Sequence, residues 1–169
     1  MRRPLAAALA GGAVLVLGSA ALAVDNTYLA SHLNGGEELP VRDTRATGTA
    51  VFKLSDDGTE LTYRLVVANI ENVVAAHIHV GAAGTNGPVV AFLFGNAPAG
   101  GGRVNGVLAT GTITASNLVG PLTGASLSAL VSAIEAGNAY VNVHTNDGVG
   151  DPNSGPGDFP GGEIRAQME

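Results

Sequence analysis

The chain has 169 residues, with 14 acidic side chains, 8 basic side chains and a formal net charge of −6 at pH 7. It contains no cysteine, which excludes a disulfide scaffold, a thiolate metal site and a cysteine nucleophile. The negative charge argues against binding to nucleic acid, which needs a basic patch, and a composition of 46% hydrophobic and 13% charged residues excludes a disordered tail.

Residues 1–23 predict a secretory signal peptide. Arg2 and Arg3 form a short positive region, residues 4–23 carry no charge, and Ala21 and Ala23 supply the small residues of a cleavage site. Cleavage after Ala23 would leave residues 24–169 as one mature domain that is secreted or periplasmic. The alternative is an uncleaved membrane anchor, because an uncharged stretch of this length can just span a bilayer. After cleavage we expect no membrane association.

The residue pattern of the mature chain predicts a succession of short strands interrupted by one helix. Alternating polar and apolar residues between glycine-rich turns predict strands at 27–33, 47–54, 61–67, 75–80, 88–94, 104–115, 139–145 and 163–168. Between residues 126 and 136 the apolar residues instead follow a helical spacing, with Ser126 placed as the N-cap and Gly137 just after the C-cap. The pattern predicts an all-β fold, an antiparallel Greek-key or immunoglobulin-like β-sandwich with one short helix.

Three of the four histidines are predicted to share one face of the sheet. His77 and His79 lie two residues apart on the strand 75–80, so they project from the same side. In the strand 139–145, Val141 and Val143 belong to the core, which turns His144 outward. If these strands are neighbours, the three imidazoles converge. The same alternation places three further polar side chains around them as candidates for supporting contacts: Asn142, Glu163 and Arg165.

Two histidines on one strand face and a third on another strand are typical of a transition-metal site. Imidazole is a ligand for copper and zinc, and three ligands can leave a coordination position open for water or substrate. Because imidazole binds a metal in its neutral form, affinity is expected to fall below about pH 6.5. The alternative is a polar surface whose histidines bond to loop backbone. The fourth histidine, His32, is interpreted as a surface residue.

Two acidic features are weaker candidates. The glycine-rich loop at 146–162 carries oxygen ligands that would suit Ca²⁺, but their spacing does not match an EF-hand, and a solvated surface connection is the preferred interpretation. Glu37 and Glu38, adjacent carboxylates on an expected turn, are likewise interpreted as solvated charges. The oxygen-bearing side chains of the loop are Asp147, Asp151, Asn153 and Asp158.

Five motifs, in order along the chain, resemble those of the CHRD (chordin) domain. They are residues 33–40 with 46–50, 76–81 (Ala-His-Ile-His-Val-Gly), 84–90, 137–145 (Gly-Asn-Ala-Tyr-Val-Asn-Val-His-Thr) and 160–167 (Pro-Gly-Gly-Glu-Ile-Arg-Ala-Gln). The resemblance spans residues 27–168 and implies an extracellular β-sandwich module that presents the three histidines on its surface. In animals such domains occur in chordin, a secreted antagonist of bone morphogenetic proteins. In microbes they occur as stand-alone secreted proteins.

A second, partial resemblance is to the copper-ligand layout of Cu,Zn superoxide dismutases. That layout also has an H-x-H strand followed by glycine and a later strand that ends in Val-His, here at His77, His79 and His144. The bridging histidine, the zinc-loop ligands and the disulfide of that family have no counterpart in this sequence.

Three hypotheses about function remain open from the sequence. The first is a secreted CHRD-domain binding module whose three histidines hold copper or zinc, with an unknown extracellular protein or small ligand as partner. The second is an extracellular copper-dependent redox enzyme that uses the open coordination position. The third is a metal-free cell-surface interaction protein. Metal stoichiometry separates the third from the others, and turnover of the metal-loaded protein separates the first two.

Overall fold

The computed structural model describes residues 26–169, so the predicted signal peptide and its cleavage site lie outside the described residues. This part of the chain contains eight strands, one α-helix and three short 3-10 helices: η1 (Gly35–Glu37), η2 (Ala115–Asn117) and η3 (Gly120–Leu122). None of its helices has the length and apolarity needed to cross a membrane. The elements are β1 (Thr27–Asn34), β2 (Thr47–Leu54), β3 (Leu61–Glu71), β4 (Val73–Val80), β5 (Val89–Phe94), β6 (Arg103–Ile113), α1 (Leu127–Glu135), β7 (Ala139–Thr145) and β8 (Ile164–Gln167).

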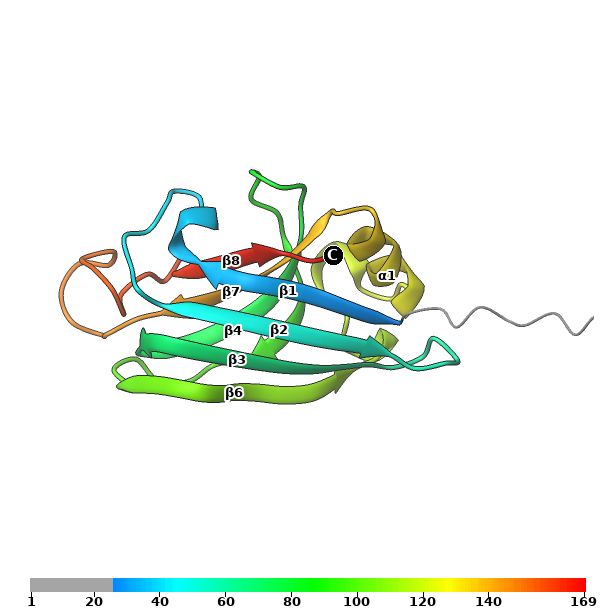
Figure 1. The fold of residues 1–169 in the computed structure, drawn as a ribbon, viewed down its shortest axis with the longest axis horizontal. Helices are drawn as coiled ribbons and strands as arrows, with labels where there is room; N and C mark the ends of the chain where they lie inside the picture. Colours follow the sequence, from blue (N-terminus) through cyan, green and yellow to red (C-terminus); the bar gives the residue numbers. More distant parts are fainter. Residues whose placement is uncertain (1–25) are drawn as a thin grey trace, which may run out of the picture.

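The strands form one continuous antiparallel sheet in the order β5-β4-β7-β8-β1-β2-β3-β6. The sheet coils into a nearly closed barrel, with β8, β1, β2, β3 and β6 along one wall and β4 and β7 crossing behind them (Figure 1). The predicted all-β antiparallel fold with one short helix is confirmed. The two separate sheets of a sandwich are not observed, because β8 pairs with both β7 and β1 and joins the two walls.

The core fills the interior of the barrel with alternate residues of each strand. On β2, for example, Ala50 and Phe52 are fully buried, whereas Val51 and Lys53 face outward and are exposed. At the open seam, the Tyr63 hydroxyl on β3 donates a hydrogen bond of 2.7 Å to the carbonyl of Leu93 on β5. The interior side of the sheet therefore follows the period of two that the sequence predicts.

Helix α1 lies at one end of the barrel, beside the C-terminus (Figure 1). Its four apolar residues at helical spacing are all buried, as predicted. Gly137 has φ +67°, and the N–H groups of Gly137 and Asn138 donate to the carbonyls of Ile134 and Ala133, both at 2.8 Å. This is a Schellman motif, which satisfies the last carbonyls of the helix. Ser126 occupies the N-cap position without making a side-chain capping bond.

The strands that carry the candidate site are neighbours. His77 on β4 lies opposite Asn142 on β7, which lies opposite Arg165 on β8, so the three side chains form one row across the outer face. That face is not a free surface: all seven residues of β7 are buried. The loop after β4 covers it, since the amide of Asn86 donates to the carbonyl of Leu39 and also accepts from Arg165. The expectation of a surface-exposed face is therefore corrected.

Candidate metal centre

The three predicted histidines converge on the outer face of β4 and β7. One potential ligand atom of each ring lies within 4.8 Å of the other two. The ring centroids of His77 and His144 are 4.7 Å apart, and those of His77 and His79 are 5.6 Å apart. His79 and His144 are buried, while His77 is half-buried. His32 is exposed on β1, as predicted.

Backbone carbonyls define the tautomers of two of these rings. His79 Nδ1 lies 2.8 Å from the carbonyl oxygen of Gly87, and His144 Nδ1 lies 2.8 Å from that of Pro160. Because a carbonyl oxygen only accepts, each Nδ1 must carry the hydrogen, and the Nε2 of each neutral ring keeps a free lone pair. His79 Nε2 is buried and has no hydrogen-bond partner. A metal-binding histidine is commonly anchored in this way through its other nitrogen.

The lone pair on His144 Nε2 faces two further groups. His77 Nδ1 lies 3.0 Å from it and Asn142 Oδ1 lies 2.9 Å from it. His77 can donate its Nδ1 hydrogen, but an amide oxygen has none to give. The contact with Asn142 is favourable only if the amide presents its NH₂ group or if a cation lies beside both lone pairs. Asn142 therefore lies directly against the cluster, where the sequence placed it.

Burial lowers the pKa of all three imidazoles. The pKa of His77 falls to about 4, first because the ring is desolvated and then because His144 and His79 would repel its charge. Desolvation is also the largest cause of the lowered pKa values of His79 and His144, against the opposing hydrogen bonds to Gly87 and Pro160. The rings are neutral at pH 7, and protons compete with a metal at lower pH than the value of about 6.5 expected from the sequence.

The metal-free protein is expected to lose stability as the pH falls from about 7 to 5. The unfolded chain protonates its histidines near pH 6.5, whereas the folded cluster does not, so acid favours the unfolded state. Glu38 acts in the opposite sense, because its pKa is raised in the folded state to about 7. Denaturant unfolding at pH 7, 6 and 5 with a chelator measures the net change, and Glu38→Gln should steepen the decline. If the free energy of unfolding of Glu38→Gln instead increased as the pH fell from 7 to 5, this result would contradict the lowered histidine pKa values.

Tyr140 and Arg165 support the cluster from the side of β8. The His79 ring stacks on Tyr140, with centroids 4.7 Å apart and 9° between the planes, and the Arg165 guanidinium carbon lies 3.4 Å from the Tyr140 centroid. The guanidinium is buried and donates to Asn86 Oδ1 (3.2 Å) and to the carbonyl of Thr85 (2.8 Å). Arg165 thus lies one aromatic ring away from His79 and holds the loop that covers the cluster.

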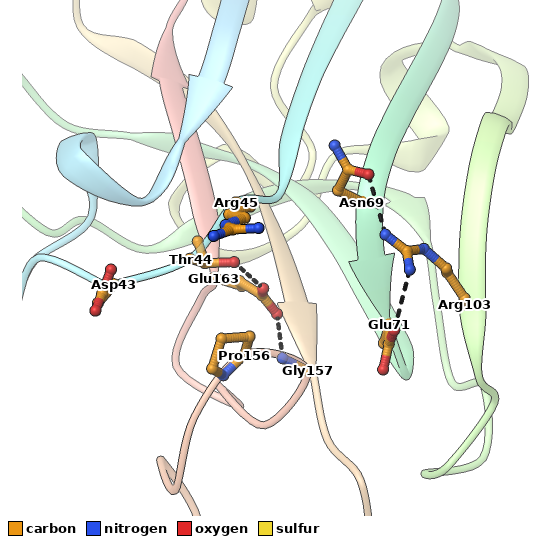
Figure 2. Close-up of a pocket in the computed structure, with 9 residues that line it drawn as sticks. All are labelled: Asp43, Thr44, Arg45, Asn69, Glu71, Arg103, Pro156, Gly157 and Glu163. Carbon is orange, nitrogen blue, oxygen red and sulfur yellow. Dashed lines mark hydrogen bonds and ion pairs between the residues drawn. The ribbon is translucent and has the colours of Figure 1, made fainter.

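Glu163, the third predicted supporting residue, lies in a different place. Its carboxylate accepts hydrogen bonds from the hydroxyls of Thr44 and Thr145, both at 2.6 Å, and from the N–H of Gly157 at 2.9 Å. It lines a polar cavity of about 620 Å³. Figure 2 shows Arg103 on the opposite side of this cavity. Both carboxylate oxygens are used, and among residues 26–169 no hydrogen bond joins Glu163 to an imidazole.

Glu38 is a buried carboxyl, although the sequence was interpreted as placing it in solvent. It is 3% exposed, and its Oε1 atom has no hydrogen-bond partner. Burial raises its pKa to about 7, although Arg165, Arg42 and the side chain of Asn142 favour the ionised form. The interpretation of adjacent solvated charges is correct for Glu37, which is exposed, and wrong for Glu38. Polarity and position on a turn gave no indication of which of the two would point inward.

The loop at 146–162 does not gather its carboxylates into a cation site. Asp158 accepts from the N–H and the hydroxyl of Ser154, at 3.0 and 2.9 Å, and Asp147 accepts from the N–H of Val149 at 2.8 Å. These bonds stabilise turns within the loop. In the part of the chain that the structure describes, the histidine cluster is the one group of three or more side chains arranged to hold a metal.

A comparison with known protein families tests the resemblance to the CHRD domain that the sequence motifs indicated. The family model of the CHRD domain matches residues 29–152, which include the three histidines and Asn142. This chain belongs to the CHRD domain family. The match to the CHRD domain ends before β8, so Glu163 and Arg165 lie outside it. No curated protein and no solved structure gives a significant match to this CHRD domain.

Proposed function

We propose that this CHRD domain is an exported module that binds one transition-metal ion, copper or zinc, through His77 Nδ1, His79 Nε2 and His144 Nε2. The observation that carries the proposal is the pair of rings anchored by backbone carbonyls, because the Nε2 atoms of both neutral rings then carry a lone pair and no hydrogen, in a cluster whose ligand atoms lie within 4.8 Å of one another. Binding to an unpartnered, buried His79 Nε2 would satisfy an atom that otherwise remains desolvated without a hydrogen bond.

The spacing of the nitrogens fits a metal ion after small side-chain rotations. A metal about 2.0–2.1 Å from each nitrogen at tetrahedral angles needs nitrogens about 3.3 Å apart. The separation of His77 Nδ1 and His144 Nε2 is 3.0 Å, and the set of three ligand atoms spans no more than 4.8 Å. His77 would move its hydrogen from Nδ1 to Nε2, which an imidazole can do without gaining charge.

The donor set also bears on the choice of metal. Three neutral imidazoles suit copper and zinc, and Cu(II) binds most strongly among the divalent first-row ions. His77 is half-buried and packs edge-on against the exposed ring of Phe92, at a centroid distance of 4.8 Å. This side of the cluster is the natural place for a fourth ligand, such as water or a small molecule. We further propose a location outside the cytoplasm, supported by the signal-like segment, and an extracellular protein or small ligand as partner.

Metal content of the protein purified after export tests the proposed function. We expect about one copper or zinc ion per chain and a higher melting temperature with metal than without. A His77→Ala/His79→Ala/His144→Ala variant should hold no ion and show no metal-dependent change in melting temperature. Wild-type protein that stays empty and melts at one temperature with or without metal would favour the metal-free interaction protein. Turnover by the copper-loaded protein would favour the redox enzyme.

A further inference from the structure

Two buried side-chain polar atoms in residues 26–169 have no hydrogen-bond partner: His79 Nε2 and Glu38 Oε1. The first is a proposed metal ligand. The second belongs to the same buried layer, because the side chain of Asn142 interacts with the Glu38 carboxyl and also lies 2.9 Å from His144 Nε2. A single amide side chain therefore separates the carboxyl from the three-histidine cluster.

The backbone around Glu38 is shaped to hold its carboxyl in this place. Gly162 has φ +123°, and a Cβ atom there would overlap the carboxyl of Glu38. Hydrogen bonds hold the chain on both sides of Glu38: Asn34 Oδ1 accepts from the N–H of Gly36 before it, and the Gly35 carbonyl accepts from the N–H of Arg42 after it, each at 2.8 Å. The carboxyl is thus held between Asn142 on β7 and Gly162, two residues before β8.

The groups that face this carboxyl come from three parts of the chain. Arg165 on β8 and Arg42 in the segment between β1 and β2 contribute positive charge, and Asn142 on β7 and the N–H of Leu39 contribute hydrogen bonds. All four favour the ionised form, yet desolvation outweighs them. A divalent ion among three neutral imidazoles would add two further positive charges to this layer, with no anionic ligand of its own.

We propose that Glu38 is the counter-charge of the metal site, a carboxyl that carries a proton in the metal-free protein and releases it to solvent when a divalent ion binds to the three histidines. This inference rests on the proposed function. One proton leaves the Glu38 carboxyl for each ion bound, and the carboxylate stays against Asn142 without coordinating the metal. The net charge added to the buried layer is then one rather than two.

The number of protons released per bound metal ion can be measured. With a pKa of about 7, Glu38 is protonated in half of the metal-free molecules at pH 7, so binding should release about half a proton per ion, and nearly one at pH 6. The imidazoles contribute less to the release than the carboxyl does, because burial lowers the pKa of all three rings. By linkage, metal affinity should weaken about tenfold between pH 8 and pH 6.

Calorimetric titration with Zn²⁺ in two buffers of different ionisation enthalpy measures this proton count. Glu38→Gln keeps the shape of the side chain but has no proton to release, so we expect Zn²⁺ binding with a release near zero and an affinity that is flat between pH 8 and pH 6. Glu163→Gln is the matched control, because it removes another buried carboxyl, in a cavity away from the histidines, and should keep the wild-type release.

The outcomes separate the two proposals. Equal proton release by the wild type and Glu38→Gln would assign the proton to another group, such as metal-bound water, and overturn the role of Glu38 alone. A wild-type protein that binds neither Zn²⁺ nor Cu²⁺ would overturn the proposed function as well. Infrared difference spectra of the wild type provide a test without any variant: the band of a protonated carboxyl should disappear when Zn²⁺ is added, and its persistence would contradict the proposal.

Discussion

Replacement of His79 by alanine is expected to weaken binding of Cu²⁺ or Zn²⁺ by about a hundredfold or more, because one of three ligands is lost. We expect the free energy of unfolding of the metal-free protein to change less than the free energy of metal binding. The reason is that the variant also removes a buried nitrogen that has no hydrogen-bond partner in the metal-free state. Competition titration against a chelator of known affinity measures the change.

His32→Asn is the matched control for this variant. His32 is exposed and has φ +59°, and asparagine tolerates this left-handed backbone better than alanine does. Its metal affinity should equal that of the wild type. Equal losses in the two variants, or full affinity in His79→Ala, would show that His79 is not a ligand.

Gly87→Ala is expected to weaken metal binding by about 10- to 100-fold and to lower the free energy of unfolding by about 1–3 kcal/mol. A Cβ atom on Gly87 would overlap the carbonyl of Val80, so the covering loop must shift. The shift displaces the carbonyl that holds His79 Nδ1 and the N–H that donates to the Tyr140 hydroxyl at 3.1 Å. The ring of His79 then loses the anchor that directs Nε2 toward the metal.

Gly155→Ala controls for the general effect of adding a methyl group to a glycine-rich loop. Nothing lies within 4 Å of a Cβ at this position, so neither metal affinity nor stability should change appreciably. Calorimetry and denaturant unfolding on both variants measure the two effects. A Gly87→Ala protein with wild-type affinity would mean that the carbonyl of Gly87 does not orient the ligand.

Local structure was largely predictable from the sequence, because strand periodicity and turn residues are local signals. The boundaries of β2 and β7 match the predictions, whereas β3 extends four residues beyond its predicted end at residue 67. Asn69 has φ +55° there, and the pairing with β6 resumes at Ile70 after an irregularity. A β-bulge accommodates the residues after 67, where the sequence pattern predicted the end of the strand. The pairing of β1 with β8 joins distant parts of the chain, and alternation along single strands contains no information about it.

The candidate site was predictable as far as the side of each strand. Period-two alternation places His77, His79 and His144 on one face, and the neighbouring positions of β4 and β7 bring them together. The burial of that face was not predictable, because it depends on the path of the loops that carry Glu38 and Gly87. The anchoring carbonyls of Gly87 and Pro160 were missed for the same reason, since any residue type can supply a backbone carbonyl.

Long-range proton–nitrogen NMR of the imidazoles in Zn²⁺-loaded protein tests the metal centre most directly, because it identifies which nitrogen of each ring is coordinated. We expect one equivalent of Zn²⁺ to shift Nδ1 of His77 and Nε2 of His79 and His144, while the Nδ1 hydrogens of His79 and His144 remain. Spectra in which one equivalent of Zn²⁺ leaves the three rings unchanged, or in which His79 coordinates through Nδ1, would contradict the three-histidine site.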